Sequence, residues 1–371
     1  MSVLDDVNQH RNELRTDSYT TTISDLLSAY KRGDLHINPE YQRLFRWDLQ
    51  SQSEYIESLL LNIPTPPLFF ATNPDGKNEV IDGLQRLSTL IKFFASEIFE
   101  NSSFATERNN EDEQNNIQVG TMLLEAPLVT SLDGYTLSTL PETLTRILRY
   151  TRVPIILLEK ESSQRARYHV FKRLNRSGSV LTDQEIRNSS ARLFGNEFPE
   201  ALRTLAENEY IKKALNLPDQ QVKSMTIDEY ILRLLANVYN PTPLKHSVTE
   251  LLDDFMEYAS EGKFQLDKSI IERVELSFMN ISNIFPNGEA FRYWRDNRAQ
   301  GQFSPNLFDI ISYGVFKNID ALKENPELIK TKIHQLHDNE ELKELVGAGS
   351  NTRKKYLGRL TLGESWFKIA G

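Results

Sequence analysis

One short segment, Asp82-Gly83-Leu84-Gln85-Arg86, combines the residue types that phosphate chemistry needs. Apolar residues precede it and leucines at helical spacing follow it, which predicts a strand that turns at Gly83 into a helix. The first N–H groups of that helix would form an anion site, where the Arg86 guanidinium can fork onto a phosphate. Gln85 can hold a water or a ligand oxygen, and Asp82 can bind Mg²⁺ or orient a nucleophilic water. We therefore predict Asp82, Gln85 and Arg86 as catalytic residues, with Gly83 beside the bound phosphates.

The same segment also has a purely structural interpretation. Asp82 would then be the N-cap of the helix, Gly83 a turn residue and Arg86 a solvated surface residue. The segment is not a Walker A loop, and Asp-Gly followed by Arg is a common combination, so its residues alone leave both interpretations open.

A second segment brings arginines together with aromatic residues in a stretch that reads as extended. Arginines pair with phosphates, and aromatic rings stack on bases. The segment is Asn38-Pro39-Glu40-Tyr41-Gln42-Arg43-Leu44-Phe45-Arg46-Trp47. It predicts nucleotide contacts by Tyr41, Gln42, Arg43 and Trp47, and it offers Glu40 as a second candidate ligand for Mg²⁺. The alternative is an amphipathic strand whose Tyr41 and Trp47 belong to the core.

A third segment follows a helix predicted over residues 163–174. It reads as a loop, Asn175-Arg176-Ser177-Gly178, whose Asn175 and Gly178 are candidate nucleotide contacts. Thr182 and Glu185 then have the spacing of a capping box, which opens the next helix. The alternative is an ordinary helix end followed by a capped helix.

In this order, the three segments resemble the N-terminal domain of the GmrSD-type modification-dependent restriction family. That family is marked by Tyr-Gln-Arg…Trp, by Asp-Gly-Gln-Gln-Arg…Thr-Leu, and by Phe…Leu-Asn-x-x-Gly…Leu-Thr…Glu-Leu. The matching residues are Tyr41-Gln42-Arg43…Trp47, Asp82-Gly83-Leu84-Gln85-Arg86…Thr89-Leu90, and Phe171…Leu174-Asn175…Gly178…Leu181-Thr182…Glu185-Ile186. The resemblance covers residues 20–195.

The resemblance implies a ParB/sulfiredoxin-like core, nucleoside triphosphate binding and hydrolysis at residues 82–86, and a role in restricting phage or foreign DNA. The chain departs from the family in two respects. Leu84 stands where the family has glutamine, and we expect it to be a core residue. The His-Asn-His nuclease domain of DNA-cutting members is not recognisable; the nearest candidate is His334 with His337, one helical turn apart, which could share a metal.

Hydrophobic periodicity predicts an α+β chain, with a mixed α/β domain at residues 1–200 and a mostly helical domain at 201–371. The polar stretch 101–118 is predicted to be an insertion or a long loop. Predicted strands span 68–72, 79–81 and 153–158, and predicted N-terminal helices span 20–35, 51–62 and a stretch that begins near 82. Further helices are predicted at 199–214, 226–239, 247–260, 266–284, 304–316 and 325–346.

Composition excludes several classes of function. The chain has 371 residues and no cysteine, which rules out disulfides, thiolate zinc sites and a cysteine nucleophile. It has neither an apolar run of about 18 residues nor the apolar core of a signal peptide, so we expect a cytoplasmic protein without a membrane partner. The net charge of -9 argues against non-specific electrostatic binding of DNA over the whole protein surface. Eleven Lys and Arg against five Asp and Glu between Glu142 and Arg192 form a basic island that suits a nucleotide better.

Three functions are compatible with these residues. The first is an NTPase that uses Mg²⁺ and controls DNA restriction or a partner effector. The second is a non-catalytic, antitoxin-like regulator that senses a nucleotide or DNA and controls a separately encoded nuclease. The third is a direct DNA nuclease. The expected partner is a nucleoside triphosphate; DNA, an effector nuclease and a second copy of the chain are further candidates.

Overall fold

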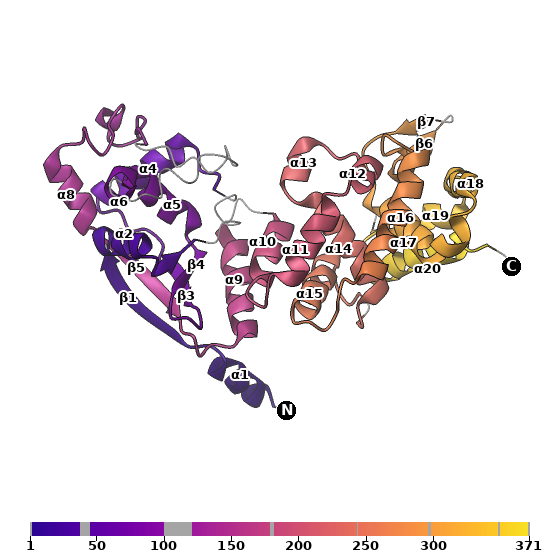
Figure 1. Cartoon of the computed structure of the whole chain (residues 1–371), viewed down its shortest axis with the longest axis horizontal. Coiled ribbons are helices and arrows are strands. Elements are labelled where there is room, and N and C mark those ends of the chain that lie inside the picture. Colours follow the sequence, from indigo (N-terminus) through magenta and orange to yellow (C-terminus); the bar gives the residue numbers. More distant parts are fainter. Residues whose placement is uncertain are drawn as a thin grey trace. The chain divides into compact units, whose positions relative to one another are not determined.

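The computed structural model describes residues 2–37, 45–99, 121–178, 182–242, 244–295, 298–347 and 349–369, without the side chains of Gln9 and residues 175–178. The predicted contacts at Glu40, Tyr41, Gln42 and Arg43 and the predicted insertion at 101–118 lie outside these residues. The chain divides into two compact units, Met1–Val180 and Leu181–Gly371 (Figure 1). The division falls before the boundary at residue 200 that periodicity predicts.

The N-terminal unit is built on a mixed five-stranded sheet with strand order β1-β5-β3-β4-β2. β1 pairs with β5 and β3 with β4 antiparallel, whereas β5 pairs with β3 and β4 with β2 in parallel. The strands are β1 Thr16–Thr22, β2 Leu35–His36, β3 Leu68–Thr72, β4 Asn78–Asp82 and β5 Arg152–Leu158. The helices are α1 Val3–Asn12, α2 Ile23–Arg32, α4 Leu49–Leu60, α5 Leu84–Phe93, α6 Ala95–Phe99, α8 Glu142–Tyr150 and α9 Gln164–Gly178, with the 3₁₀ turn η1 Thr130–Leu132.

Helices α2, α4, α5, α6 and α8 contact one another beside the sheet, and α9 contacts β4 (Figure 1). Helix α5 turns Leu87, Leu90 and Ile91 inward, and all three are buried. Complete burial of such a side chain contributes about 1.5–3 kcal/mol. These contacts fix the orientation of α5 and therefore the place where its first turn meets the sheet.

The hairpin β3–β4 leads directly into the first turn of α5. Its register shifts between Phe69, which faces Asp82, and Phe70, which faces Val80, so that Ile81 is an extra residue. Such a bulge bends a strand and redirects the side chains beside it. Here it lies at the last two residues of β4, directly before the helix.

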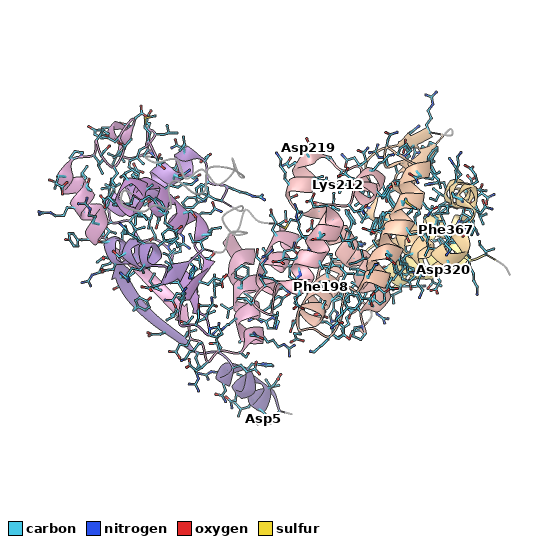
Figure 2. The ribbon with its side chains drawn as sticks, in the orientation of Figure 1. Asp5, Phe198, Lys212, Asp219, Asp320 and Phe367 are labelled. Carbon is cyan, nitrogen blue, oxygen red and sulfur yellow. The ribbon has the colours of Figure 1, made fainter. Side chains whose placement is uncertain are left out.

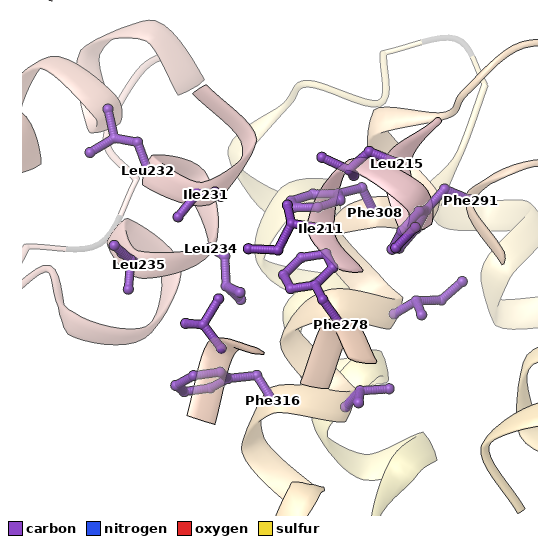
Figure 3. Close-up of a cluster of buried hydrophobic side chains, with 14 of the residues drawn as sticks. Ile211, Leu215, Ile231, Leu232, Leu234, Leu235, Phe278, Phe291, Phe308 and Phe316 are labelled. Carbon is purple, nitrogen blue, oxygen red and sulfur yellow. The ribbon is translucent and has the colours of Figure 1, made fainter. Parts of the chain in front are cut away.

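The C-terminal unit is helical apart from the hairpin β6 Tyr293–Arg295 and β7 Arg298–Gln300. Its first helices are α10 Asp183–Ala191, α11 Glu197–Ala206, α12 Glu209–Leu215, α13 Asp219–Lys223, α14 Thr226–Tyr239 and α15 Val248–Ser260. They are followed by α16 Lys268–Ile284, the 3₁₀ turn η2 Glu289–Phe291, α17 Pro305–Leu322, α18 Pro326–Leu336, α19 Glu340–Leu345 and α20 Arg353–Phe367. Ile211, Leu234, Phe278 and Phe308 meet in its apolar core (Figure 3).

Side chains of the C-terminal unit separate into a buried and an exposed set. Phe198 and Phe367 are buried, whereas Asp219 and Asp320 lie on the surface (Figure 2).

The prediction of a mixed α/β part followed by a mostly helical part, α+β as a whole, is confirmed.

Several predicted boundaries are wrong for local reasons. Residues 20–22 continue the strand β1, because Thr22 is the N-cap of α2 and its side chain accepts the N–H of Asp25. The predicted loop at residues 175–178 is the last turn of α9. The predicted helix 325–346 is two helices, since Asn339 caps α19 by accepting the N–H of Leu342.

Candidate nucleotide site at the start of helix α5

Gly83 makes the turn from β4 into α5, as the sequence predicts. It is the N-cap of α5 with φ 93° and ψ 17°, in the left-handed region. A Cβ atom built on it would lie 2.3 Å from Leu68 Cδ2. The alternative in which Asp82 is the N-cap is therefore wrong, and Gly83 has no side chain with which to cap the helix. The N–H groups of the first turn are anion-binding groups in any α-helix.

Arg86 is held among backbone carbonyls. Its Nη1 donates to the carbonyl oxygens of Pro66 and of Pro67, the latter at 3.2 Å, and its Nη2 donates to Asp82 Oδ2 at 3.1 Å. The side chain is only 12% exposed. The prediction of a solvated surface residue is thus wrong. Arg86 thus connects the Pro66-Pro67 segment that precedes β3 to the end of β4.

Gln85 joins two of the three motif segments. Its Oε1 accepts the backbone N–H of Arg46 at 2.9 Å and that of Trp47 at 3.1 Å. The segment 45–48 therefore lies against the first turn of α5, as expected if the two motifs share a site. The sequence indicated Gln85 as a ligand contact; nothing in its spacing points to a bond with backbone amides 38 and 39 residues away.

The segment 45–48 is also fixed from α4. Gln52 Nε2 donates to the carbonyl oxygens of Trp47 at 2.9 Å and of Asp48 at 3.2 Å. The Asp48 side chain caps α4 by accepting the N–H of Ser51 at 2.8 Å, and this hydrogen bond lowers the pKa of Asp48. Periodicity alone could not show that Gln52, on a helix of mixed composition, reaches back to Trp47.

The two described aromatic residues of this segment lie against side chains of the unit. The Trp47 ring meets the Tyr55 ring edge to face, with centroids 5.7 Å apart, and Lys92 Nζ lies 3.7 Å from the centre of the Phe45 ring. Burial raises the pKa of Tyr55 to about 12, against the opposing effect of Arg86, and burial lowers the pKa of Lys92. Trp47 is half-buried, so it combines a packing contact with a partly open surface.

The remaining motif residues are placed as follows. Leu84, predicted to be a core residue, is only half-buried. Asn175 and Gly178 belong to the last turn of α9, and their side-chain surroundings lie outside the described residues. The capping box of Thr182 and Glu185 is confirmed, and it lies in the C-terminal unit.

Among the described residues, no group of three or more His, Asp or Glu is arranged to hold a metal ion. His334 packs against the Trp294 ring at 4.3 Å between centroids, in an aromatic cluster with Phe285. Burial lowers the pKa of His337 to about 4. The geometry thus gives this pair a packing role, and the described part of the chain supplies no third ligand beside it.

Some cations of the predicted basic island make contacts within the fold. Arg167 and Arg187 are buried, and Arg187 bonds Asp253 Oδ1 at 2.8 Å inside the C-terminal unit. Arg149 is paired with Glu97 at 2.6 Å. These three arginines therefore take part in packing or ion pairs within the protein.

A comparison with sequence families matches residues 23–192 to the GmrSD restriction endonuclease N-terminal domain. No nuclease domain family was found C-terminal to it. No curated protein and no solved structure matches the chain. None of the helices within the described residues is long and apolar enough to cross a membrane. Residues 23–192 are therefore similar to the GmrSD restriction endonuclease N-terminal domain family.

Proposed function

We propose that the N-terminal unit binds a nucleoside triphosphate with Mg²⁺ at the start of α5, hydrolyses it, and thereby controls DNA restriction or a partner effector nuclease. The family is associated with restriction systems. The observation that carries the proposal is the hydrogen bonding between two motifs: Gln85 Oε1 accepts the backbone N–H groups of Arg46 and Trp47, so that their segment lies against the first turn of α5.

The phosphates would lie at the first turn of α5, where the helix dipole favours an anion. Phosphoryl transfer depends mainly on positioning and on neutralising charge, and this arrangement offers both. The half-buried Trp47 would contact the base or sugar. The predicted contacts of Tyr41, Gln42, Arg43, Asn175 and Gly178, and the weaker metal contact of Glu40, stay predictions.

The donor set fits Mg²⁺ that arrives with the nucleotide. Mg²⁺ usually takes one or two protein carboxylates and completes its shell with phosphate and water oxygens. Asp82 is 30% exposed and uses Oδ2 for Arg86, so its carboxylate can supply one further oxygen. Bound there, Mg²⁺ would neutralise charge that develops on the phosphates. Asp82 would also be the residue that orients the attacking water.

A non-catalytic regulator is the second candidate, and the surroundings of Arg86 favour it. An arginine whose guanidinium is bonded to two carbonyls and a carboxylate is available for a transition state only if it leaves them. In such a regulator, nucleotide binding without hydrolysis would control the activity of a separately encoded nuclease.

The test is a thermal-shift panel of ATP, GTP, CTP and UTP, each with and without Mg²⁺, followed by phosphate release. Binding raises the apparent stability by mass action, by about 2.7 kcal/mol at a hundredfold excess over Kd. The proposal predicts a shift with at least one nucleotide, and turnover that Asp82→Asn removes while binding is kept. Binding without turnover in the wild type would select the regulator, and no shift with any nucleotide contradicts both.

A further inference from the structure

Strand β1 has one edge that no other described strand covers. It is the first strand in the order β1-β5-β3-β4-β2 and lies at the outer edge of the sheet (Figure 1). Its residues 16–20 are all exposed. It contains neither proline nor lysine, and its seven residues pair with β5 without a bulge, so it lacks the usual devices that protect a sheet edge. Such an edge is a template for a further strand.

The hydrogen bonds at both ends of β1 show which backbone groups face the open edge. The carbonyl of Arg15 accepts the N–H of Glu159 at 3.0 Å, and the N–H of Ile23 donates at 3.1 Å to the residue that precedes β5. Because bonding alternates along an antiparallel ladder, the odd-numbered residues bond to β5 and the even-numbered residues face outward. Thr20 agrees with this, since it lies opposite Pro154, which has no N–H to donate.

We propose that β1 pairs antiparallel with β1 of a second copy of this chain, about a two-fold axis at Tyr19, so that two sheets become continuous. Tyr19 is the middle residue of Thr16–Thr22, and full overlap of the two strands therefore places it opposite itself. In this register Ser18 lies opposite Thr20 of the second copy, and their outward backbone groups exchange N–H···O bonds. The Tyr19 pair falls at a non-hydrogen-bonded position, where side chains approach most closely and aromatic pairs stabilise a sheet.

The open edge gains partners in this arrangement. Tyr19 is 40% exposed, although it lies directly opposite the buried Ile155, so its ring continues an apolar face of the sheet to the edge. A second Tyr19 ring would cover it. The N–H of Ser18, which donates to Asp17 Oδ1 at 2.8 Å in the single chain, would donate to a backbone carbonyl instead.

The charges beside β1 favour the same chain as the occupant. In the proposed register Asp17 lies opposite Thr21 of the second copy, so the two carboxylates do not face each other. The exposed Arg15 lies opposite Ile23 of the second copy, two residues before the exposed Asp25. Opposite charges therefore meet at both ends of the paired strands, which supports antiparallel self-association.

The register is tested by a disulfide cross-link, because the chain contains no cysteine of its own. Tyr19→Cys places two thiols at a pair whose Cα atoms lie about 4.5 Å apart, within the range of a disulfide. Thr16→Cys is the matched control on the same exposed strand, since its two thiols would lie about 20 Å apart. Oxidation of the full-length variants should give about tenfold more covalent dimer with Tyr19→Cys, measured on a non-reducing gel.

The pairing itself is tested by the mass of the full chain in solution, from light scattering over a range of concentrations. The expected mass is twice the 42.8 kDa of one chain. Thr20→Pro removes only an outward N–H, which edge strands tolerate, and Tyr19→Lys sets two like charges opposite each other. Both variants should have the mass of one chain, with wild-type circular dichroism. Tyr150→Lys changes a 67% exposed tyrosine on α8 of the same unit and should remain a dimer.

The result expected is a doubled mass that Thr20→Pro and Tyr19→Lys both abolish, with cross-linking concentrated in Tyr19→Cys. If Thr20→Pro does not fold, Tyr19→Lys and the cross-link decide. A wild type with the mass of one chain at every concentration overturns the proposal and leaves the edge to a strand of another protein. A dimer that Tyr19→Lys preserves, or equal cross-linking of Tyr19→Cys and Thr16→Cys, overturns it as well. None of these results depends on whether a nucleotide binds.

Discussion

At the scale of the residue, Gly83 shows how one position fixes the geometry of the site. It combines a left-handed backbone with an approach that leaves no room for a methyl group. Both requirements are met only by glycine, so this residue is needed before any ligand is considered. Arg86 shows that an arginine in a motif predicted to bind phosphate can instead donate to carbonyl oxygens and a carboxylate of the fold.

We predict that Gly83→Ala destabilises the N-terminal unit by about 3 kcal/mol or more, from backbone strain plus the clash with Leu68. Gly76→Ala is the control, because Gly76 also has a positive φ of 84° but nothing within 4 Å of the added Cβ. Gly76→Ala should lower the free energy of unfolding by about 1 kcal/mol. Urea unfolding of both variants measures the difference, and equal costs would show that the contact with Leu68 does not matter.

Asp228 predicts a pH dependence at the same scale. It is buried, accepts Arg203 Nη1 at 2.9 Å and Asn188 Nδ2 at 3.4 Å, and burial raises its pKa to about 6. A pKa raised on folding adds stability at low pH that is lost as pH rises through the folded value. The free energy of unfolding of Asp228→Asn, relative to that of the wild type, should therefore be higher at pH 7 than at pH 4, by on the order of 1–3 kcal/mol. Unfolding curves at both pH values check this, and a constant difference contradicts it.

At the scale of the element, strand β4 and helix α5 were predictable because several local signals agree. An apolar run, an Asp-Gly turn and a change of period to helical spacing all point to strand, turn and helix. Strand β1 was not predicted, because its sequence Thr16–Thr22 is polar and lies at an exposed edge of the sheet. The backbone partners of Gln85 and Arg86 were not predictable either, since backbone groups leave no mark in the sequence.

Three helices of the C-terminal unit are joined by one buried carboxylate. Asp309 on α17 bonds Arg233 of α14 at 2.6 Å and Arg359 of α20 at 3.1 Å, and all three side chains are buried. Asp309→Ala would leave two buried cations uncompensated, which should cost about 3–5 kcal/mol. Asp320→Ala on the same helix is the control: Asp320 is 72% exposed and should cost at most about 1 kcal/mol. Similar losses in the two variants, measured by denaturant midpoint, would contradict this account.

At the scale of the whole molecule, family and structure divide the chain at different points. The family match ends at residue 192, whereas the second compact unit begins at Leu181, so α10 belongs to both. Among the described residues, the apolar core cluster of that unit runs from Ala191 to Phe367, and all of its members follow the division. A fragment of residues 181–371 should therefore be helical and unfold cooperatively. A fragment without a cooperative transition would show that the unit depends on the preceding residues.

The central claim, that a nucleoside triphosphate binds at the first turn of α5, is tested most directly by amide hydrogen exchange of the full chain. The nucleotide that stabilises the protein is added with Mg²⁺, and exchange is followed at Gly83–Arg86 and across residues 182–369. The account predicts slower exchange at Gly83–Arg86 when the nucleotide is bound. A nucleotide that binds but leaves these amides unchanged, or protects only the C-terminal unit, would contradict it.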